Sequence, residues 1–402
     1  MDLISNSKDW KESDDNQTPE FKGQEVKKGE IDYILLSVII ILYGIGIIMV
    51  FSAGISEGIK YGEYLYFLKR QVVWLGISFL TLIFFIFVDS ASLERVIKPL
   101  IWVIIFMLAM LLVPIFVERG VVHPSRRWFR FGDIGFQPSE FAKIVLVLYL
   151  ASIFSKKGER INDFYRGFLP PFLIISVISF LIFLEPDFST AFMLFFIAIL
   201  MFFIAGIRTI SIVSLMVVSI PALFLMINNE MYRKERIAGF LNPWADPTDK
   251  GYQIIQSFKA FAFGGFFGVG LGRSVQKMNH LPIPHTDFIY AIAAEEMGYI
   301  GALLILLVYM VFAYRGFRIA GMQQDNFSFF LAFGITSLII WGVVFNISVV
   351  TGLLPSTGVS LPFLSYGGSS LLANSIMAGI LLNLSKNRTI SITQTEKLVW
   401  EQ

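Results

Sequence analysis

Long runs of apolar residues dominate the chain, and short polar segments separate them. A helix needs about 20 mostly apolar residues to cross the hydrocarbon core of a bilayer. By this criterion the pattern predicts ten spanning helices, at 33–53, 71–88, 98–117, 140–155, 169–184, 189–205, 209–227, 288–314, 328–350 and 368–384. The chain is therefore expected to be an all-α polytopic membrane protein.

The polar segments at the two ends of the chain are predicted to be tails, one before and one after a membrane domain of residues 32–386. Residues 1–31 mix charges of both signs with few aliphatic side chains, which is typical of a disordered tail. Residues 387–402 form the second tail. When the long loop 228–287 is left out, Lys and Arg are about twice as frequent in the segments on the side of the N-terminus. This bias predicts that both tails are cytoplasmic and that the long loop is extracytoplasmic.

The composition agrees with a membrane protein and excludes several kinds of site. Charged residues make up 15% of the chain, whereas a typical soluble domain has about 25%. The sequence has no Cys and 3 His, which excludes disulfides and thiol catalysis and argues against a His-rich metal site. The net charge of +2 gives no indication of a nucleic-acid partner, and none is expected.

Carboxylates at the start of the eighth predicted span need an explanation, because charged side chains are costly at membrane depth. The stretch LPIPHTDFIYAIAAEEMG places Asp287 at the mouth of the helix and Glu295 and Glu296 inside it. Asp287 could be the N-cap of the helix, a group that faces a cleft, or both. Glu295 and Glu296 could be functional, or they could bind a structural partner such as Lys143 or a backbone donor.

A cationic cluster lies on the predicted outer face, where positive charge is disfavoured. The stretch RRWFRFGDIGFQPSEFAK contains its members, Arg126, Arg127, Arg130 and Lys143. The cluster could anchor the protein at lipid headgroups, with Trp128 as an interfacial aromatic residue. It could instead bind a phosphate group, because Arg offers two donors in a fixed geometry. Glu140 and Lys143 share one helix face and could simply pair.

Further polar or irregular segments lie on the same predicted face. In EPDFSTA, Pro186 predicts a tight turn, and Asp187 or Ser189 a cap of the next helix. The segment 352–375 is broken by Pro and Gly, and such a backbone at membrane depth must line a cavity or be buried in protein. Together with the cationic cluster and the long loop, these segments predict an outward-facing cleft.

The long loop contains an apolar stretch, 252–263, that is too short to span a membrane. It is expected to lie in the interface or to re-enter the membrane beside protein. Glycines follow it at 264, 265, 268, 270 and 272. These are expected to serve turns or close packing, because a dinucleotide fingerprint would need a preceding strand. The polar residues expected to line the outer surface here are Gln256, Lys259, Arg273, Gln276 and Lys277.

Several of these stretches resemble, in the same order, motifs of the SEDS family (shape, elongation, division and sporulation), which are polytopic polymerases of peptidoglycan glycan strands. The stretches are RRWFRFGDIGFQPSEFAK, EPDFSTA, GYQIIQSFKAFAFGGFFGVGLGRSVQK, LPIPHTDFIYAIAAEEMG and LPSTGVSLPFLSYGGSS. GLGRSVQK before HTDF resembles the FtsW division branch and its sporulation relative more than the RodA elongation branch. Ser356 and Ala294 depart from the family pattern, but neither change removes a group that would do chemistry.

The resemblance implies that the substrate is lipid II, a disaccharide-pentapeptide on undecaprenyl pyrophosphate, and that Asp287 in HTDF is the catalytic carboxylate. The reaction would need a base for a sugar hydroxyl and positive charge at the departing pyrophosphate. That charge could come from Arg126, Arg127 and Lys143 or from a divalent cation, Mg or Mn, and no organic cofactor is expected. Substrate-binding residues are expected among Arg126, Arg127, Trp128, Glu140, Lys143, Asp187, Gln256, Lys259, Arg273, Gln276, Lys277, His285, Ser365, Gly367, Gly368 and Ser369.

The resemblance also implies a place in the cytoplasmic membrane at the division septum. The expected partners are a class B penicillin-binding protein with transpeptidase activity and other membrane proteins of the division complex. The alternatives are a lipid II flippase, an elongation polymerase of the RodA type, and a scaffold that only docks a partner. A flippase would carry polar residues through the full membrane depth, whereas the unusual charge here lies on the predicted outer side.

Overall fold

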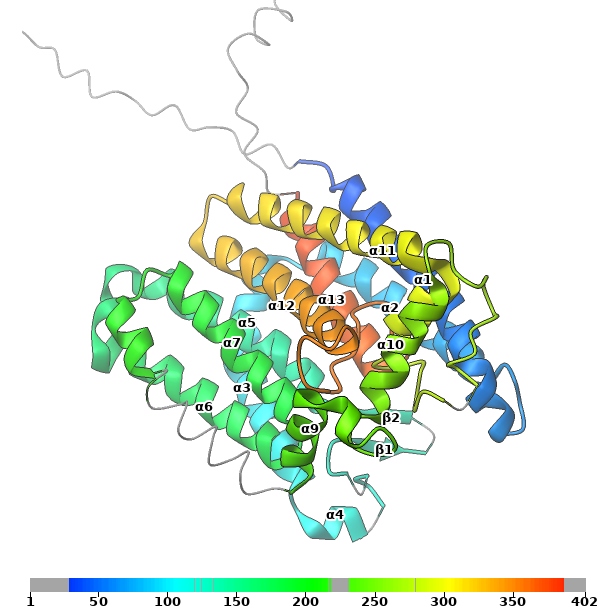
Figure 1. Ribbon diagram of the computed structural model, residues 1–402. Helices are drawn as coiled ribbons and strands as arrows, with labels where there is room; N and C mark the ends of the chain where they lie inside the picture. The colour runs from blue at the N-terminus through cyan, green and yellow to red at the C-terminus, as the bar shows by residue number, and fades with distance from the viewer. Residues whose placement is uncertain are drawn as a thin grey trace, which may run out of the picture.

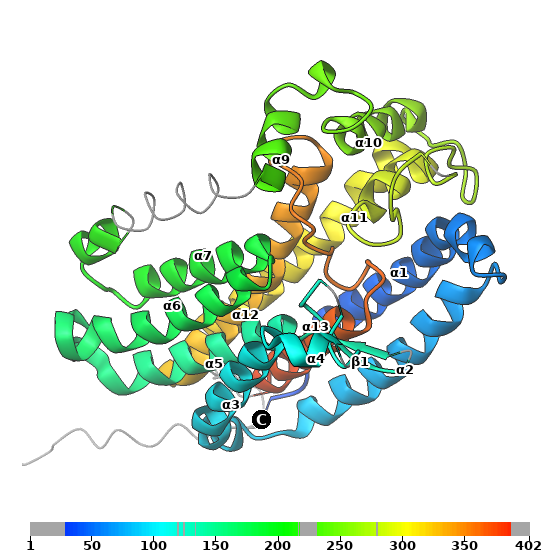
Figure 2. The same cartoon turned by 90° about the horizontal axis from the view of Figure 1, so that it is seen from below.

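The computed structural model describes residues 29–118, 120–123, 125–132, 134–215, 217, 231–278 and 280–386. A bundle of long helices dominates this part of the chain (Figure 1). The bundle consists of α1 (Tyr33–Lys60), α2 (Tyr66–Phe87), α3 (Ser90–Leu111), α5 (Pro138–Lys157), α6 (Leu169–Leu184), α7 (Phe188–Ile204), α11 (Ile289–Gly321), α12 (Asn326–Val350) and α13 (Gly368–Leu384). Helices α12 and α13 lie in the middle, with α1 and α2 on one side and α6 and α7 on the other (Figure 2).

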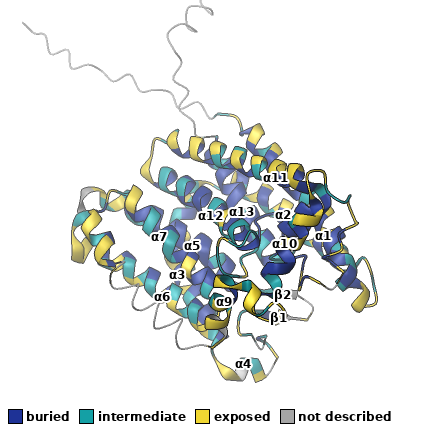
Figure 3. Ribbon diagram, viewed as in Figure 1, coloured by how far each residue is buried: buried dark blue, intermediate teal, exposed yellow. Residues whose placement is uncertain are grey.

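Length and composition show which of these helices suit a bilayer. Within the described ranges, 6 helices are long and apolar enough to cross a membrane, and α7 and α13 are shorter apolar helices. The outward faces carry large apolar side chains, as expected for contact with lipid: on α2, Val73 is 62% exposed and Leu80 is 69% exposed. Buried residues gather on the inward faces and along the central helices (Figure 3).

Each predicted span except 209–227 overlaps one of these helices. The range 209–227 lies largely outside the described residues, as do the tails predicted at the two ends of the chain. The third predicted span, 98–117, differs from the helix in the structure, because α3 begins earlier, at Ser90, and ends earlier, at Leu111. The first turns of α3 carry charged residues, which the search for apolar runs leaves out. Pro114 begins a separate short helix, α4 (Pro114–Glu118).

One end of the bundle carries the irregular elements, and we call it the loop-rich end (Figure 1). Its elements are α4, β1 (Phe129–Phe131), β2 (Ile134–Phe136), α9 (Met231–Leu241), η3 (Pro243–Ala245) and α10 (Tyr252–Gly264). Strands β1 and β2 form an antiparallel hairpin that the apolar pattern does not predict. At the opposite end lie η1 (Gly158–Asn162) and η2 (Phe164–Phe168). The first and last described residues also meet there, because the amide of Gly29 donates to the carbonyl of Lys386.

Helix α11 is broken at Gly298, whose φ of 71° and ψ of −173° are not helical. The glycine-rich loop after α10 fills the break. The amides of Val269 and Gly270 donate to the carbonyls of Glu295 and Glu296, each at 3.0 Å. The loop therefore satisfies carbonyl groups that a broken helix would otherwise leave without a partner.

Glycines allow this close approach of two backbones. A Cβ atom at Gly264 would overlap the carbonyl of Ala294, and one at Gly268 would overlap the carbonyl of Glu296. Gly268 also has a φ of +79°, a conformation that glycine adopts at little cost. The prediction of close backbone packing at these positions is confirmed.

The two carboxylates inside α11 bind the segment that follows the glycine-rich loop. Glu296 forms an ion pair with Lys277 at 2.7 Å, and the two side chains are 0% and 1% exposed. Ser52 of α1 also donates to Glu296. Glu295 accepts a hydrogen bond from the amide of Val275 at 2.8 Å. Both carboxylates therefore have structural partners, and they tie the long loop to α1 and α11.

Candidate active site

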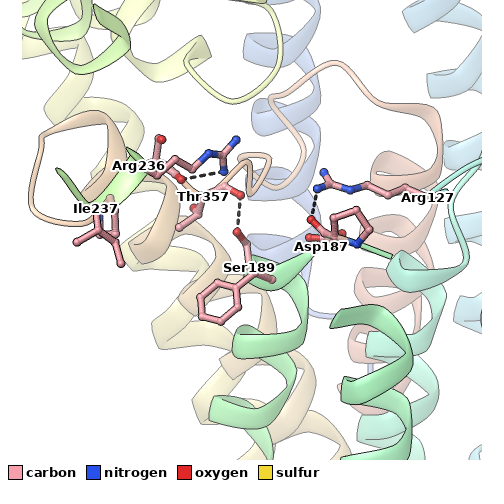
Figure 4. A pocket seen from close by; sticks show the side chains of 10 residues that line it. Arg127, Asp187, Ser189, Arg236, Ile237 and Thr357 are labelled. Carbon is pink, nitrogen blue, oxygen red and sulfur yellow. Dashed lines mark hydrogen bonds between the residues drawn. The ribbon is translucent and has the colours of Figure 1, made fainter. Parts of the chain in front are cut away.

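Segments that are far apart in the sequence meet in an open pocket at the loop-rich end (Figure 4). The pocket holds about 590 Å³, counting the space that is open to solvent. It is built from the chain before β1, the α6–α7 turn, α9 and residues 351–367, which we call the α12–α13 segment. The residues that line it are Arg127, Pro186, Asp187, Phe188, Ser189, Arg236, Ile237, Pro355, Ser356 and Thr357. The cationic cluster, EPDFSTA, the long loop and the Pro/Gly-rich segment therefore each contribute to one pocket, as the sequence predicts.

The α6–α7 turn lines the pocket with Pro186 and Asp187. Asp187 is the N-cap of α7, and its carboxylate accepts from the amide of Thr190 at 3.3 Å, which confirms the predicted cap. Arg127 donates to the carbonyl of Glu185 at 3.2 Å and to the carbonyl of Pro186. These carbonyls are neutral acceptors, so they orient the guanidinium without cancelling its charge.

Helix α9 supplies a second guanidinium to the pocket. Arg236 donates to the carbonyl of Ser356 at 3.0 Å, and the hydroxyl of Ser189 donates to the carbonyl of Thr357. These bonds hold the α12–α13 segment between α9 and α7. Arg236 could not be selected from the sequence, because it lies among other charged residues of a long loop and no local pattern separates it from a solvated surface.

Asp287 lies beside this pocket, against the α12–α13 segment. A Cβ atom at Gly358, the residue after Thr357, would be 3.5 Å from Oδ2 of Asp287. Asn346 of α12 donates to the carbonyl of Asp287 at 2.8 Å and to that of Val359 at 2.7 Å. This amide therefore fixes the spacing between the carboxylate-bearing segment and the pocket wall.

The prediction that Asp287 caps α11 is wrong. The N-cap residue of α11 is Phe288, and no side chain caps the helix there. Helix α11 begins at Ile289 after a turn, so Asp287 lies one residue too early to bind the first free amides of the helix. Its partly buried carboxylate is therefore available to the pocket.

Charged pocket residues act on the acidity of Asp287. Burial has the largest effect and raises the pKa of Asp287 to about 6. The positive charge of Arg236 lowers this pKa, the negative charge of Asp187 raises it, and the positive charge of Arg127 lowers it. A carboxylate with this pKa is mostly ionised at neutral pH and is a stronger base than an exposed aspartate. Burial, together with the charge of Asp187, also raises the pKa of Glu185 to about 9, while Arg127 lowers it. Glu185 is therefore uncharged at neutral pH.

The structure divides the predicted cationic cluster. Arg127 lines the pocket, whereas Arg126 and Arg130 are exposed near the hairpin. Trp128 packs against the hairpin, where a Cβ atom at Gly135 would be 3.1 Å from its ring.

Lys143 and Glu140 lie apart from the pocket lining. They form the predicted pair on α5, at 2.8 Å, and both are buried. The partner of Lys143 is therefore Glu140, and the alternative that Lys143 binds Glu295 or Glu296 is wrong.

Predicted substrate-binding residues of the long loop fall into two groups. Lys259 and Arg273 are exposed at the surface, as predicted, and a role for either in substrate binding stays a prediction. Gln256, Gln276 and Lys277 are buried, so their predicted position on the outer surface is wrong. The reason is that α10 and the following loop pack into the break of α11 instead of lying over it.

The remaining predicted residues lie around the segment between His285 and α13. His285 is buried, with its ring centroid 4.1 Å from that of Phe67, and burial lowers its pKa to about 4. Ser365 donates to the carbonyl of Thr286 at 2.7 Å. Three others begin α13: Gly367 is its N-cap, Gly368 packs against Trp74, and Ser369 accepts from the amide of Gln137. These contacts are structural, none of these residues lines the pocket, and a role for any of them in substrate binding stays a prediction.

A resident metal site does not form among the described residues, since no three His, Asp or Glu side chains converge there. Asp187 and Asp287 are the carboxylates beside the pocket, and Asp187 is already engaged as a cap. Mg²⁺ commonly binds through one or two carboxylates together with phosphate oxygens of a substrate. The predicted Mg or Mn ion could be held here by a carboxylate together with phosphate oxygens of a substrate, and its presence stays a prediction.

Comparison with known proteins finds similarity over nearly the whole chain. Residues 33–390 match the family model for FtsW, RodA and SpoVE, described as "Cell cycle protein". Stage V sporulation protein E of Bacillus subtilis is 41% identical, over 90% of this chain and 98% of its own. The probable peptidoglycan glycosyltransferase FtsW of Trichlorobacter lovleyi is also 41% identical, over 89% of this chain and 93% of its own.

Solved structures share the fold. A chain from the structure titled "Structural coordination of polymerization and crosslinking by a peptidoglycan synthase complex" aligns with a TM-score of 0.70 and 28% identity, covering 89% of this chain and 98% of that one. The rod shape determining protein RodA of Thermus thermophilus aligns with a TM-score of 0.65 and 24% identity, covering 90% and 98% of the two chains. The extent of these matches shows that the chain belongs to the FtsW/RodA/SpoVE family of SEDS membrane proteins.

Proposed function

We propose that this protein is a peptidoglycan glycosyltransferase that polymerises lipid II, with Asp287 as its base. The observation that carries this proposal is the position of one carboxylate, that of Asp287, against Gly358 and therefore beside a pocket lined by Arg127 and Arg236. Relatives that are 39% and 41% identical to this chain bear the name "Probable peptidoglycan glycosyltransferase FtsW".

The reaction needs few groups from the protein. The 4-hydroxyl of one lipid-held sugar forms a bond to C1 of another, and the bond from C1 to pyrophosphate breaks, with its electron pair leaving on undecaprenyl pyrophosphate. Asp287 takes the hydroxyl proton. Arginine guanidiniums stabilise the charge that develops on the departing pyrophosphate. A single displacement of this kind inverts the configuration at C1, so no covalent intermediate with the protein is required.

The membrane fixes the geometry of such a reaction. In the proposed topology the chain crosses the membrane ten times, both tails are cytoplasmic and the loop-rich end faces outward. The meeting of Gly29 with Lys386 at the opposite end supports this arrangement. A pocket near the outer boundary lets the bilayer hold both lipid tails while the protein aligns the two sugars, which lowers the entropic cost of the reaction.

The proposed partner is a class B penicillin-binding protein, whose transpeptidase would crosslink the new strands. Support comes from the solved peptidoglycan synthase complex, whose title names polymerisation together with crosslinking. We place the protein at the division septum with other membrane proteins of the division complex. The FtsW relatives and the GLGRSVQK stretch support the division or sporulation branch over elongation.

The test uses the chain purified with its cognate transpeptidase, lipid II, and buffers with and without Mg²⁺ or Mn²⁺. Glycan strands are measured for wild type, for Asp287→Asn, and for Asp249→Asn as a matched control, because Asp249 is an exposed carboxylate of the long loop. We expect strands from wild type and from the control, and none from Asp287→Asn. Equal synthesis by both aspartate variants would remove Asp287 as the base. Lack of strands from wild type would favour the flippase or the scaffold.

A further inference from the structure

We propose that Tyr61 and Tyr66 form a stacking platform for the sugar acceptor, the molecule whose 4-hydroxyl attacks C1. This inference rests on the proposed function and adds a second substrate site to it. Tyr61 follows the end of α1, and Tyr66 begins α2. The platform therefore lies at the turn between these helices, on the opposite side of the central helices from α6 and α7 (Figure 2). It shares no residue with the arginine-lined pocket.

The two tyrosine rings are held in one orientation. Their planes differ by 6°, and their centroids are 4.8 Å apart. The guanidinium of Arg70 lies 4.5 Å over the ring of Tyr66 and also donates a hydrogen bond to Tyr366, which fixes Tyr66. Tyr61 is 63% exposed, so ring surface stays open to a ligand. A ring that is already ordered binds a partner at a lower entropic cost.

A single aromatic ring joins the platform to the segment that carries Asp287. Phe67 packs edge-on against Tyr61, with ring centroids 5.9 Å apart, and contacts the ring of His285, with centroids 4.1 Å apart. His285 precedes Asp287 by two residues, and its carbonyl accepts from the amide of Tyr366 at 2.9 Å. A ligand on the platform is therefore held in a fixed position relative to the base.

The geometry of the proposed reaction decides which substrate the platform receives. In a single displacement the hydroxyl approaches C1 from the side opposite to the departing diphosphate. The arginine-lined pocket lies towards the α6–α7 turn and α9, next to Gly358, which Asp287 contacts. The platform lies on the other side of the Asp287 segment, towards α1 and α2 (Figure 2). The departing group and the acceptor therefore have separate places, with the base between them.

The chemistry of the platform suits a sugar. One face of an N-acetylated pyranose carries C–H groups, which are attracted to the negative face of an aromatic ring. The hydroxyls at the edge of the sugar need water or polar partners. Ion pairs of Glu57 with Lys60 and of Glu63 with Lys69 flank the turn and are partly exposed. The site therefore combines an aromatic face with a hydrated rim.

Anchoring of the two tyrosines at lipid headgroups is the competing explanation. The length of α1 argues against it. Counted from its first residue at the opposite end of the bundle, α1 has 28 residues. It therefore extends about 12 Å beyond the roughly 20 residues that cross the hydrocarbon core, at 1.5 Å per residue. The headgroup region is only about 5–8 Å thick on each side, so the turn reaches past it into water.

The experiment separates the two substrates. The donor is a lipid II whose 4-hydroxyl is replaced by hydrogen, so that it cannot be an acceptor. The acceptor is a lipid-free strand fragment of four sugars, with a 4-hydroxyl and no diphosphate. KM is measured for each with Tyr61→Ala, Tyr61→Trp and Tyr64→Ala, in the complex with the cognate transpeptidase. Tyr64 is the matched control, because it lies in the same turn with a similar exposure, 60%, outside the stacked pair. Binding of the fragment without donor is measured on the same samples, with the transpeptidase alone as the blank.

For Tyr61→Ala we expect about tenfold weaker binding of the fragment and an acceptor KM about tenfold higher, the scale of one aromatic stacking contact. The donor KM should not change. Tyr61→Trp should bind the fragment at least as tightly as wild type, and Tyr64→Ala should match wild type. Three results would overturn the platform: unchanged fragment binding by Tyr61→Ala, equal rises of both KM values, which indicate a loosened turn, or an equal loss in Tyr64→Ala, which indicates headgroup anchoring. If wild type joins no sugars, the proposed function fails, while fragment binding still decides the platform.

Discussion

The buried pair of Lys277 and Glu296 allows a quantitative test of how the long loop is held. The two charges are 2.7 Å apart, and the side chains are 1% and 0% exposed. Replacing Lys277 by Met leaves Glu296 with a hydroxyl donor, Ser52, and without a counter-charge. Removing one partner of a fully buried ion pair costs about 3–5 kcal/mol. We therefore expect Lys277→Met to lower the free energy of unfolding by that amount.

A second substitution separates the charge from the packing. In Lys277→Met/Glu296→Gln both charges are gone, and the amide can still accept a hydrogen bond. We expect most of the stability to return, with a coupling energy of about 2–3 kcal/mol between the two positions. The matched control is Lys60→Met, because Lys60 pairs with Glu57 at 2.8 Å while its side chain is 52% exposed. Breaking that pair should cost less than about 1 kcal/mol.

Unfolding in mild detergent and strand synthesis are measured on the same samples. Wild-type stability in Lys277→Met, or a double variant no more stable than the single one, would refute the reasoning. The activity of the double variant decides the predicted role of Lys277 in substrate binding. Normal synthesis by a stable double variant would make the lysine structural, whereas a stable but inactive double variant would assign it to the substrate.

Further predictions concern the backbone, a buried acid and the pocket spacing. Gly268→Ala should prevent folding, because its Cβ atom would overlap a carbonyl of α11. Gly272 has a similar φ of +80° but open space around its Cβ position, so Gly272→Ala should lower the free energy of unfolding by only about 1–2 kcal/mol. The folded-state pKa of Glu185 is raised to about 9, so its contribution to stability is complete below its ordinary pKa of 4.5 and is lost as the pH rises towards 9. Glu185→Gln should therefore lose less stability than wild type between pH 5 and pH 8.5, and parallel unfolding curves would contradict this. Asn346→Ala removes two hydrogen bonds, worth about 1 kcal/mol each, and should lower kcat with little change in KM; a change confined to KM would contradict a positioning role. Because the pKa of Asp287 is about 6, synthesis should fall about tenfold per pH unit below that value, and a flat profile down to pH 5 would argue against this base.

The spans could be predicted from the sequence because the lipid environment sets a requirement that each segment meets by its own residues. A helix in a bilayer must be apolar over its length, and hydropathy records this directly. The break at Gly298 could not be predicted in this way, because a single glycine does not interrupt an apolar run. Its partner, the loop around Gly268, is far away in the sequence, and the pairing depends on the folded structure.

The candidate site shows the same limit. Asp187 could be placed because a cap is a local interaction, and Arg127 because positive charge is unusual on the predicted outer face. Arg236 could not be found, because its role depends on contact with the α12–α13 segment. Lys277 was expected at the surface because lysine is rarely buried, and the partner that allows its burial lies on another helix.

The break in α11 has a consequence for biogenesis. At Gly298, α11 has carbonyl groups without helical partners, and Glu295 and Glu296 lie in the preceding turn. The part of α11 after Gly298 is long and apolar enough to cross a membrane, but the part before it is not suited to lipid, because lipid offers no partner for free carbonyls or carboxylates. The groups that satisfy them, on α1 and in the loop after α10, are all synthesised before α11 emerges from the ribosome. We therefore expect the part of α11 before the break to enter its final position only in contact with these earlier segments, so that tertiary folding and membrane insertion are coupled there.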